Sequence, residues 1–203
     1  ACGVAGDALA GSYVPERRPT GERNAHRSVR PGETDAADGL VGDLGTRYAS
    51  PVLAGGASAL VAPEDLAAVP GERAPHVWVA LAGRRCSTLD LWDGRLTLVT
   101  TEDAWRRAAD HVDGPLAAPH LADPDGRLAR AYALDDGGAV LVRPDGYVAW
   151  RHDTPVADPV ATLADAVDLA LGRRSGAANA PFAASTAANG AFAADEDAPV
   201  LVP

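Results

Sequence analysis

The chain has 203 residues, of which 47% are hydrophobic and 23% charged, as in a soluble globular protein with one sizeable core. Its formal charge of −10 and the lack of any basic run argue against nucleic-acid binding, and no apolar run approaches the roughly 18 residues of a membrane span. Two cysteines, Cys2 and Cys86, offer no disulfide framework, so we expect a cytoplasmic protein.

Residues 1–30 are predicted to be helical but interrupted. Leu9 and Tyr13 lie four residues apart on one apolar face. Pro15 and a second proline disfavour one continuous helix, so we expect a break near Arg17–Pro19, with Pro19 opening a new helix. Because the sequence contains no methionine, we also expect the chain to be a fragment of a longer protein. The apolar face of residues 1–30 would then have packed against a region that is absent, so we expect these residues to be poorly packed in the isolated chain.

Residues 31–74 are rich in Gly, Pro and Ala and show no sustained period, which predicts a connecting segment. The stretch "RYASPVL" (47–53) is its one plausible short strand. The stretch "GLVGDLG" (39–45) is interpreted as loop glycines, since it lacks the Gly-x-Gly-x-x-Gly spacing of a dinucleotide site.

Regular elements follow one another closely in residues 75–173. A helix after residue 101 is predicted from a capping-box-like pair, Thr100 and Asp103. The other expected elements before the final hairpin are strands at 76–81 and 95–101, a strand and turn at 87–94, a short strand within 115–121 and a short helix within 123–134.

The stretch "GAVLVRPDGYVAWRH" (138–152) predicts a hairpin with a type I turn at Arg143–Gly146 and a positive φ at Gly146. A last helix is predicted with Asp158 as N-cap and Pro159 as its first residue, closed by Gly172. Residues 174–203 are low in complexity and are predicted to form a disordered tail.

Taken together, the elements run β-β-β-α-β-α-β-β-α. This order predicts an α/β fold class: a thioredoxin-like domain with a central mixed sheet flanked by helices, preceded by a helical segment.

Thiol redox chemistry is rejected from the residues themselves, because such sites need two thiols that can exchange. The helix after the 95–101 strand opens with Thr100–Asp103, without a cysteine, and Asp136–Gly138 stand where redox members of the fold carry proline. Cys86 is interpreted as a small packing residue. Carboxylate pairs such as Asp135–Asp136 and Glu102–Asp103 are interpreted as turn and helix-start residues.

No metal-ligand spacing is found among the five histidines, His26, His76, His111, His120 and His152, which we interpret as surface or cap residues. The tryptophans are expected to pack in the core: Trp78, Trp92, Trp105 and Trp150. We therefore predict no catalytic, cofactor-binding or metal-binding residue in this chain.

The stretch "GVAGDALAGSYVPERRPTGERNAHRS" (3–28) resembles the end of the catalytic region in FAD-dependent aromatic hydroxylases, the class A flavoprotein monooxygenases. The match lies in Ala5–Asp7, Leu9, Ser12–Tyr13, Glu16–Pro19 and Arg23–Asn24, whereas Ala10 and Pro15 depart from the usual residues. Further along, "STLDLWDGRLTLVT" and "DGGAVLVRPDGYVAWR" resemble the C-terminal thioredoxin-like domain of the phenol and polyketide branch of that family.

The resemblance implies that the whole enzyme binds FAD, takes hydride from NADPH or NADH, and uses O2 to hydroxylate a phenolic or polyketide ring. Its flavin and nucleotide motifs would lie upstream of residue 1, so this chain alone is expected to be structural and non-catalytic. Its main partner would be that FAD-binding region, and a homo-oligomer stays open. The alternative is a freestanding, redox-inactive thioredoxin-like binding module.

Overall fold

The computed structural model describes residues 4–29, 36–55, 57–134 and 137–174. The first elements are α1 (Asp7–Gly11), α2 (Tyr13–Val29), α3 (Ala36–Leu44), β1 (Thr46–Arg47), β2 (Ala59–Leu60) and the 3-10 helix η1 (Pro63–Asp65). The others are β3 (Trp78–Leu81), β4 (Arg84–Ser87), the 3-10 helix η2 (Thr88–Leu91), β5 (Leu96–Thr100), α4 (Asp103–Ala109), β6 (Leu116–Ala117), β7 (Leu121–Ala122), α5 (Arg127–Tyr132), β8 (Ala139–Val142), β9 (Val148–His152) and α6 (Pro159–Ala170). The predicted tail from residue 175 onward, Cys2 and Asp135–Asp136 lie outside the described residues.

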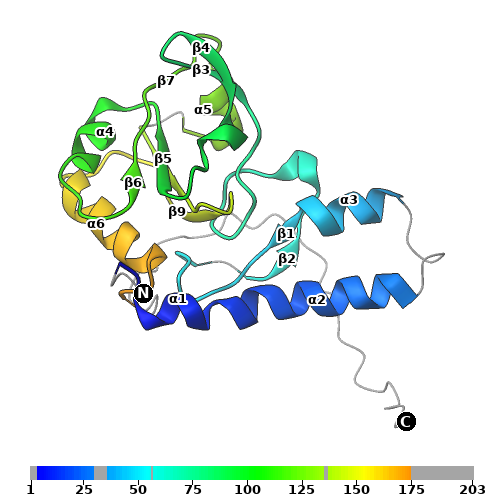
Figure 1. Cartoon of the computed structure of the whole chain (residues 1–203). Helices are drawn as coiled ribbons and strands as arrows, with labels where there is room; N and C mark the ends of the chain where they lie inside the picture. Colours follow the sequence, from blue (N-terminus) through cyan, green and yellow to red (C-terminus); the bar gives the residue numbers. More distant parts are fainter. Residues whose placement is uncertain (1–3, 30–35, 56, 135–136, 175–203) are drawn as a thin grey trace.

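A four-stranded mixed sheet in the order β6-β5-β8-β9 forms the centre of the main body (Figure 1). Strand β5 runs parallel to β6 and antiparallel to β8, and β8 pairs antiparallel with β9. Helices α4 and α6 cover one face, whereas α5 and a second sheet, β4-β3-β7, cover the other. This arrangement confirms the predicted α/β fold, a mixed sheet flanked by helices.

Burial on both faces explains why β8 is apolar without interruption and why every residue of β5 is buried, Thr97 and Thr100 included. Successive residues of a strand point to opposite faces, and the two buried clusters follow that alternation. Leu98 belongs to the cluster that contains Trp105 of α4, whereas its neighbour Val99 belongs to the cluster that contains Leu128 of α5.

The final hairpin and helix have the predicted local chemistry. Arg143 N donates to Tyr147 O at 2.8 Å, Gly146 N donates to Arg143 O at 2.9 Å, and Gly146 has a φ of 81°. The Asp158 carboxylate caps α6 by accepting from Ala161 N at 3.0 Å. Gly172 follows this helix with a φ of 66°.

Three local predictions in this half of the chain were wrong in detail. The strand expected at 87–94 ends at Ser87, which caps η2 together with Asp90. Thr100 and Asp103 form no capping box, since Glu102 is the N-cap and Asp103 pairs with Arg106. The strand expected within 115–121 is split into β6 and β7, with Pro119 between them, because proline lacks the N–H that a ladder needs.

The break predicted near Arg17–Pro19 was also wrong. Helix α2 continues from Tyr13 to Val29 with Pro19 inside it, and the chain breaks at Ser12 instead. Pro15 lies in the first turn of α2, where the backbone N–H groups have no partner within the helix, so this proline removes no hydrogen bond. Pro19 lies inside the helix and removes one. Contacts on both sides of Pro19, described below, hold the two halves in line.

The connecting segment contains more structure than its composition indicates. "GLVGDLG" lies mostly within α3 and is not a loop, and only Arg47 of "RYASPVL" is in a strand. The glycines serve close packing: a Cβ on Gly42 would lie 2.5 Å from the guanidinium of Arg27, and one on Gly45 would lie 1.8 Å from Val61 O. In the part of the chain that the structure describes, no helix combines the length and apolarity that crossing a membrane requires.

Candidate functional site

The β5–α4 junction is where a redox thioredoxin-like domain would carry its thiols. In this chain the junction is held by hydrogen bonds between β5, α4 and the loop before β8. Thr100 Oγ1 donates to Gly138 O at 2.9 Å and accepts from Glu102 N at 3.1 Å. Trp105 Nε1 donates to Gly137 O at 3.1 Å. Cys86 lies on β4, opposite Val79, and packs partly buried against the α5-side core. The junction therefore joins strand, helix and loop.

The histidines do not converge on a common site. His26, His76, His111 and His120 are exposed, and His152 is half-buried beside Trp105 and Trp150. Among the residues with described positions, no three His, Cys, Asp or Glu side chains lie close enough together to hold a metal ion. Of the tryptophans, Trp105 and Trp150 are in the core as predicted, but Trp78 is 47% exposed, which corrects that expectation.

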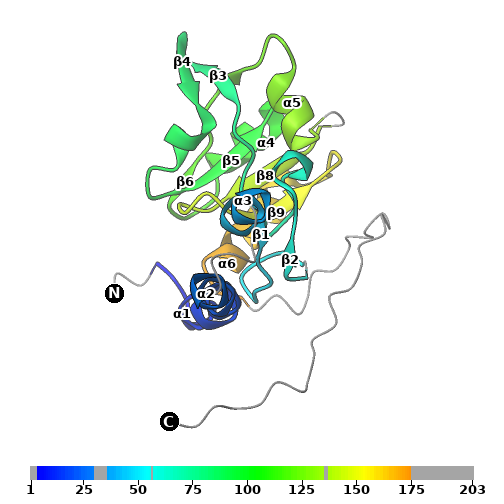
Figure 2. The same cartoon turned by 90° about the vertical axis from the view of Figure 1, so that its right-hand side faces the viewer.

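A second feature is the way α1 and α2 dock on the rest of the molecule. Figure 2, in which α2 is seen nearly end-on, shows these helices along one side, with α6 and β1 beside them. We call the segment from Val4 to Val29 the arm. In α2 and its N-terminal flank the inward positions are polar and recur at helical spacing, whereas in α1 Ala8 and Leu9 are half-buried. The polar set is Ser12, Glu16, Thr20, Arg23 and Arg27.

The strongest of these contacts joins the arm to the final hairpin. The Glu16 carboxylate, 4% exposed, accepts from Arg143 Nη1 at 2.9 Å across 127 positions in the sequence. Burial lowers the pKa of the Arg143 guanidinium, but its bonds to Glu16 and Asp145 outweigh that and raise it overall. A buried charge of this kind depends on its partner, so the pair fixes where α2 lies.

Two further contacts lie along α2. Arg17 Nη1 donates to Tyr48 Oη at 3.1 Å, and the Tyr48 ring stacks on Tyr147 with centroids 4.5 Å apart. Burial, together with Tyr48, raises the pKa of Tyr147 to about 12. Beyond Pro19, Arg23 Nη2 donates to Thr46 Oγ1 at 3.0 Å, so α2 is held on both sides of its internal proline.

The start of the arm is hydrogen-bonded to the residues at the end of α6. Gly6 N donates to Leu171 O at 2.9 Å, and Arg173 Nε donates to Val4 O at 2.8 Å. A Cβ on Gly6 would lie 2.2 Å from Gly172 O, so only glycine permits this approach. The sequence analysis missed this contact, because its residues lie more than 160 positions apart.

The outward side of the arm carries the apolar side chains. Tyr13, Val14 and Val29 are 67%, 59% and 75% exposed, whereas the buried residues of α2 and its N-terminal flank are Glu16 and Ser12. The same side also carries the exposed ion pair of Arg18 and Glu22, so these three are scattered apolar residues of the ordinary kind.

Residues 67–174, just over half of the chain, match the family model described as "Aromatic-ring hydroxylase, C-terminal". The chain belongs to that family. The match spans the thioredoxin-like body, from the approach to β3 to the end of α6.

Relatives extend the similarity across most of the chain. It is 35% identical over 198 residues to the tetracenomycin A2 monooxygenase-dioxygenase of Streptomyces glaucescens, covering 86% of this chain and 35% of that protein. It is 34% identical to the 4-methyl-5-nitrocatechol 5-monooxygenase of a Burkholderia species, covering 84% of this chain and 37% of that protein. The structure of aklavinone-11 hydroxylase with FAD and aklavinone superposes with a TM-score of 0.73 at 32% identity, covering 83% of this chain and 36% of that one. This aromatic-ring hydroxylase C-terminal region thus spans about a third of its relatives' length.

The described residues do not fit a flavin dinucleotide. A diphosphate is held by glycine-rich backbone at a helix N-terminus that follows a strand. The β5–α4 junction instead presents Glu102 and Asp103, whose negative charges oppose a phosphate. At the other two junctions, β7–α5 and β9–α6, Asp123 and Asp158 already accept from the first backbone N–H groups of the helix. A hydrogen bond from Arg106 lowers the pKa of Asp103 and keeps it ionised.

Proposed function

We propose that this chain is the C-terminal portion of an FAD-dependent monooxygenase that hydroxylates a phenolic or polyketide ring with NAD(P)H and O2. The observation that carries the proposal is the match of the body to the aromatic-ring hydroxylase family, in a chain that spans about a third of its relatives' length and whose arm docks on that body through Glu16. FAD would supply the oxygen chemistry, and an N-terminal region of the whole protein would hold it. The free thiol Cys86 is in keeping with a cytoplasmic location.

We further propose a division of labour along the chain. Residues 1–30 would belong to the catalytic region, 31–74 would connect, 75–173 would form the redox-inactive thioredoxin-like domain, and 174–203 would form a tail. In this view the body fixes the arm through Glu16 and Arg143, and the arm carries that position to the flavin-binding region. The chain alone would then be structural and supply no catalytic residue.

The test is to determine the reading frame upstream of the Ala1 codon and to express the longer product beside the 203-residue chain. We expect an open frame encoding a strand-linked Gly-x-Gly-x-x-Gly. The longer protein should retain FAD and consume NAD(P)H and O2 when a phenolic substrate is added, and the shorter chain should do neither. An in-frame stop followed by a fresh start would instead favour the freestanding binding module.

A further inference from the structure

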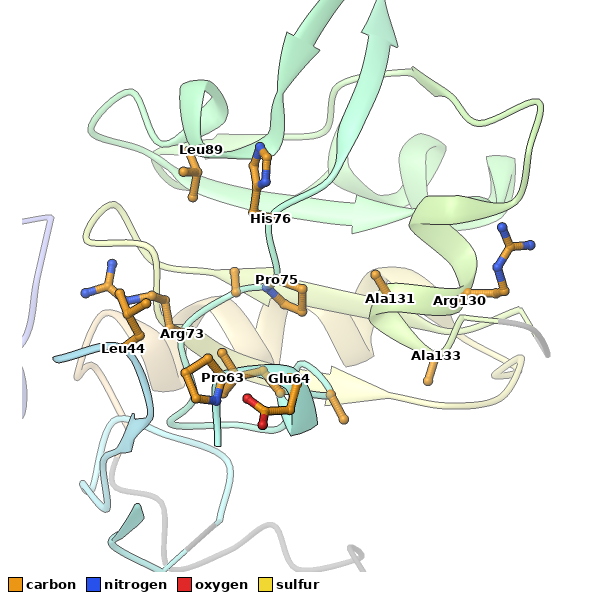
Figure 3. Close-up of a pocket in the computed structure, with 13 residues that line it drawn as sticks. Leu44, Pro63, Glu64, Arg73, Pro75, His76, Leu89, Arg130, Ala131 and Ala133 are labelled. Carbon is orange, nitrogen blue, oxygen red and sulfur yellow. The ribbon is translucent and has the colours of Figure 1, made fainter. Parts of the chain in front are cut away.

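A cavity of about 750 Å³ lies between the thioredoxin-like body and the connecting segment (Figure 3). Small-molecule sites in proteins commonly measure about 300–1,000 Å³ and are mostly apolar with a few polar groups. Its apolar wall is formed by Leu44, Pro63, Leu66, Pro75, Leu89 and Ala131. A wall of this kind can bury both faces of an aromatic ring.

Hydrogen bonds hold the walls of this cavity in place. Arg151 bridges both sides, donating to Ala67 O at 2.9 Å on one side and, on the other, to Tyr132 O at 2.7 Å and Ala133 O at 2.6 Å. The Tyr132 hydroxyl donates to Pro75 O at 2.8 Å, which fixes the strip between them. Because these hydrogen bonds already fix the walls, a ligand that enters the cavity loses little binding free energy to the ordering of side chains and loops.

The charges that line the cavity are mostly positive, in a chain of net charge −10. Figure 3 shows Arg73 and Arg130 toward opposite ends, with His76 on the upper wall and Glu64 on the lower. Most arginines of the described chain pair with a carboxylate, but Arg73 and Arg130 make no ion pair there. The Arg73 guanidinium lies 5.3 Å from the Tyr147 ring centre, and its buried Nε has no hydrogen-bond partner.

We propose that this cavity binds a small aromatic carboxylate, with its ring between Pro75 and Ala131 and its carboxylate on Arg73. Arg73 lines the cavity and makes no ion pair among the described residues, so its guanidinium can hold a carboxylate through charge-assisted hydrogen bonds. Arg130 attracts the same charge from the other end. Glu64 is exposed and opposes it weakly, because solvent screens its charge. The proposal concerns this chain's own residues and stands apart from the proposed hydroxylase activity.

The experiment is calorimetric titration of the 203-residue chain with 2-naphthoate, beside the uncharged 2-naphthamide of the same shape. We expect the carboxylate to bind one site and the amide to bind about tenfold more weakly. Arg73→Gln should weaken naphthoate binding by about tenfold, and Glu64→Gln should strengthen it by about twofold, since it removes an opposing charge. The matched control is Arg107→Gln, an exposed arginine on α4 that makes no ion pair among the described residues and does not line the cavity.

Arg130→Gln covers the case in which Arg73→Gln unfolds the chain, because Arg130 is exposed and its loss should weaken binding by about threefold. Equal binding of acid and amide would overturn the proposal. So would equal losses in the Arg73 and Arg107 variants, or the absence of heat from 2-naphthoate at millimolar concentration.

Discussion

In the thioredoxin-like body the largest fully buried side chains are aromatic and aliphatic, among them Trp105, Leu98 and Leu141, whereas the arm buries Ser12 and Glu16. Apolar burial is not directional, so the body gains stability from many contacts that act together. Polar docking depends on a few pairs with fixed geometry. The body should therefore unfold as a unit, and the arm should detach at a lower free energy without unfolding it. Five measurements can break or sharpen this comparison.

The largest effect should come from Leu141→Ala in the centre of the sheet. This side chain is fully buried, and its truncation should cost about 3–5 kcal/mol in the free energy of unfolding measured with urea. The control is Leu40→Ala on α3, where the side chain is 57% exposed and the cost should stay within about 0.5 kcal/mol. Similar losses in both variants would show that Leu141 is not central to a cooperative core.

Next comes Glu16→Gln, which leaves Arg143 buried with Asp145 as its remaining carboxylate partner. We expect the arm to lose about 2 kcal/mol of docking free energy. Amide hydrogen exchange over residues 13–29 should then become roughly thirtyfold faster, with little change in the exchange rates of the body. Glu22→Gln removes an exposed pair with Arg18 on the same helix and should change exchange by less than about twofold. If the body exchanged faster as well, the arm and the body would be one cooperative unit.

Gly6→Ala tests the backbone contact at the start of the arm. Its Cβ would meet Gly172 O at 2.2 Å, and neither backbone can move cheaply, so α1 should detach at a cost of about 1–3 kcal/mol. Gly11→Ala is the matched control, because no neighbouring atom lies within 4 Å of its added Cβ. Hydrogen exchange over residues 4–11 distinguishes the two, and equal protection in both variants would contradict the close contact.

A smaller effect is expected from alkaline pH. The pKa of Tyr147 is raised to about 12, so its deprotonated form is disfavoured in the folded state. The stability that it contributes is complete below the unfolded pKa of about 10 and is lost as the pH rises toward the folded value. Urea unfolding between those two values should therefore show falling stability. Tyr147→Phe should make the fall less steep, and the remainder should come from Tyr132, whose pKa burial also raises. Tyr13→Phe, at an exposed tyrosine, should leave the pH profile unchanged.

The smallest effect should come from Cys86→Ser. The residue is half-buried on β4, and the Thr100–Asp103 junction offers it no second thiol. The free energy of unfolding should change by no more than about 1 kcal/mol. The chain should show no disulfide reductase activity before or after the substitution. A reductase signal that disappears with Cys86 would restore the redox hypothesis rejected from the sequence.

What the sequence determined by itself is the part governed by short-range rules. The Arg143–Gly146 turn and the Asp158 cap with Pro159 and Gly172 are specified by neighbouring residues, so they could be predicted with their geometry. The order of elements then indicated a thioredoxin-like fold, and the stretches "SYVPERRPTGERN" and "DGGAVLVRPDGYVAWR" indicated the hydroxylase family.

What only the tertiary structure decided is what depends on residues distant in the sequence. Helix α2 runs through Pro19 because Glu16 and Arg23 are held on either side of it. Helix α3 was missed because its glycines weaken helical propensity, whereas its contacts with β1 and η1 come from the tertiary structure. The cavity likewise exists because Arg151 ties together carbonyls more than 60 positions apart. Local propensity contains no information about such contacts, so the docking of the arm and the shape of the cavity came from the fold alone.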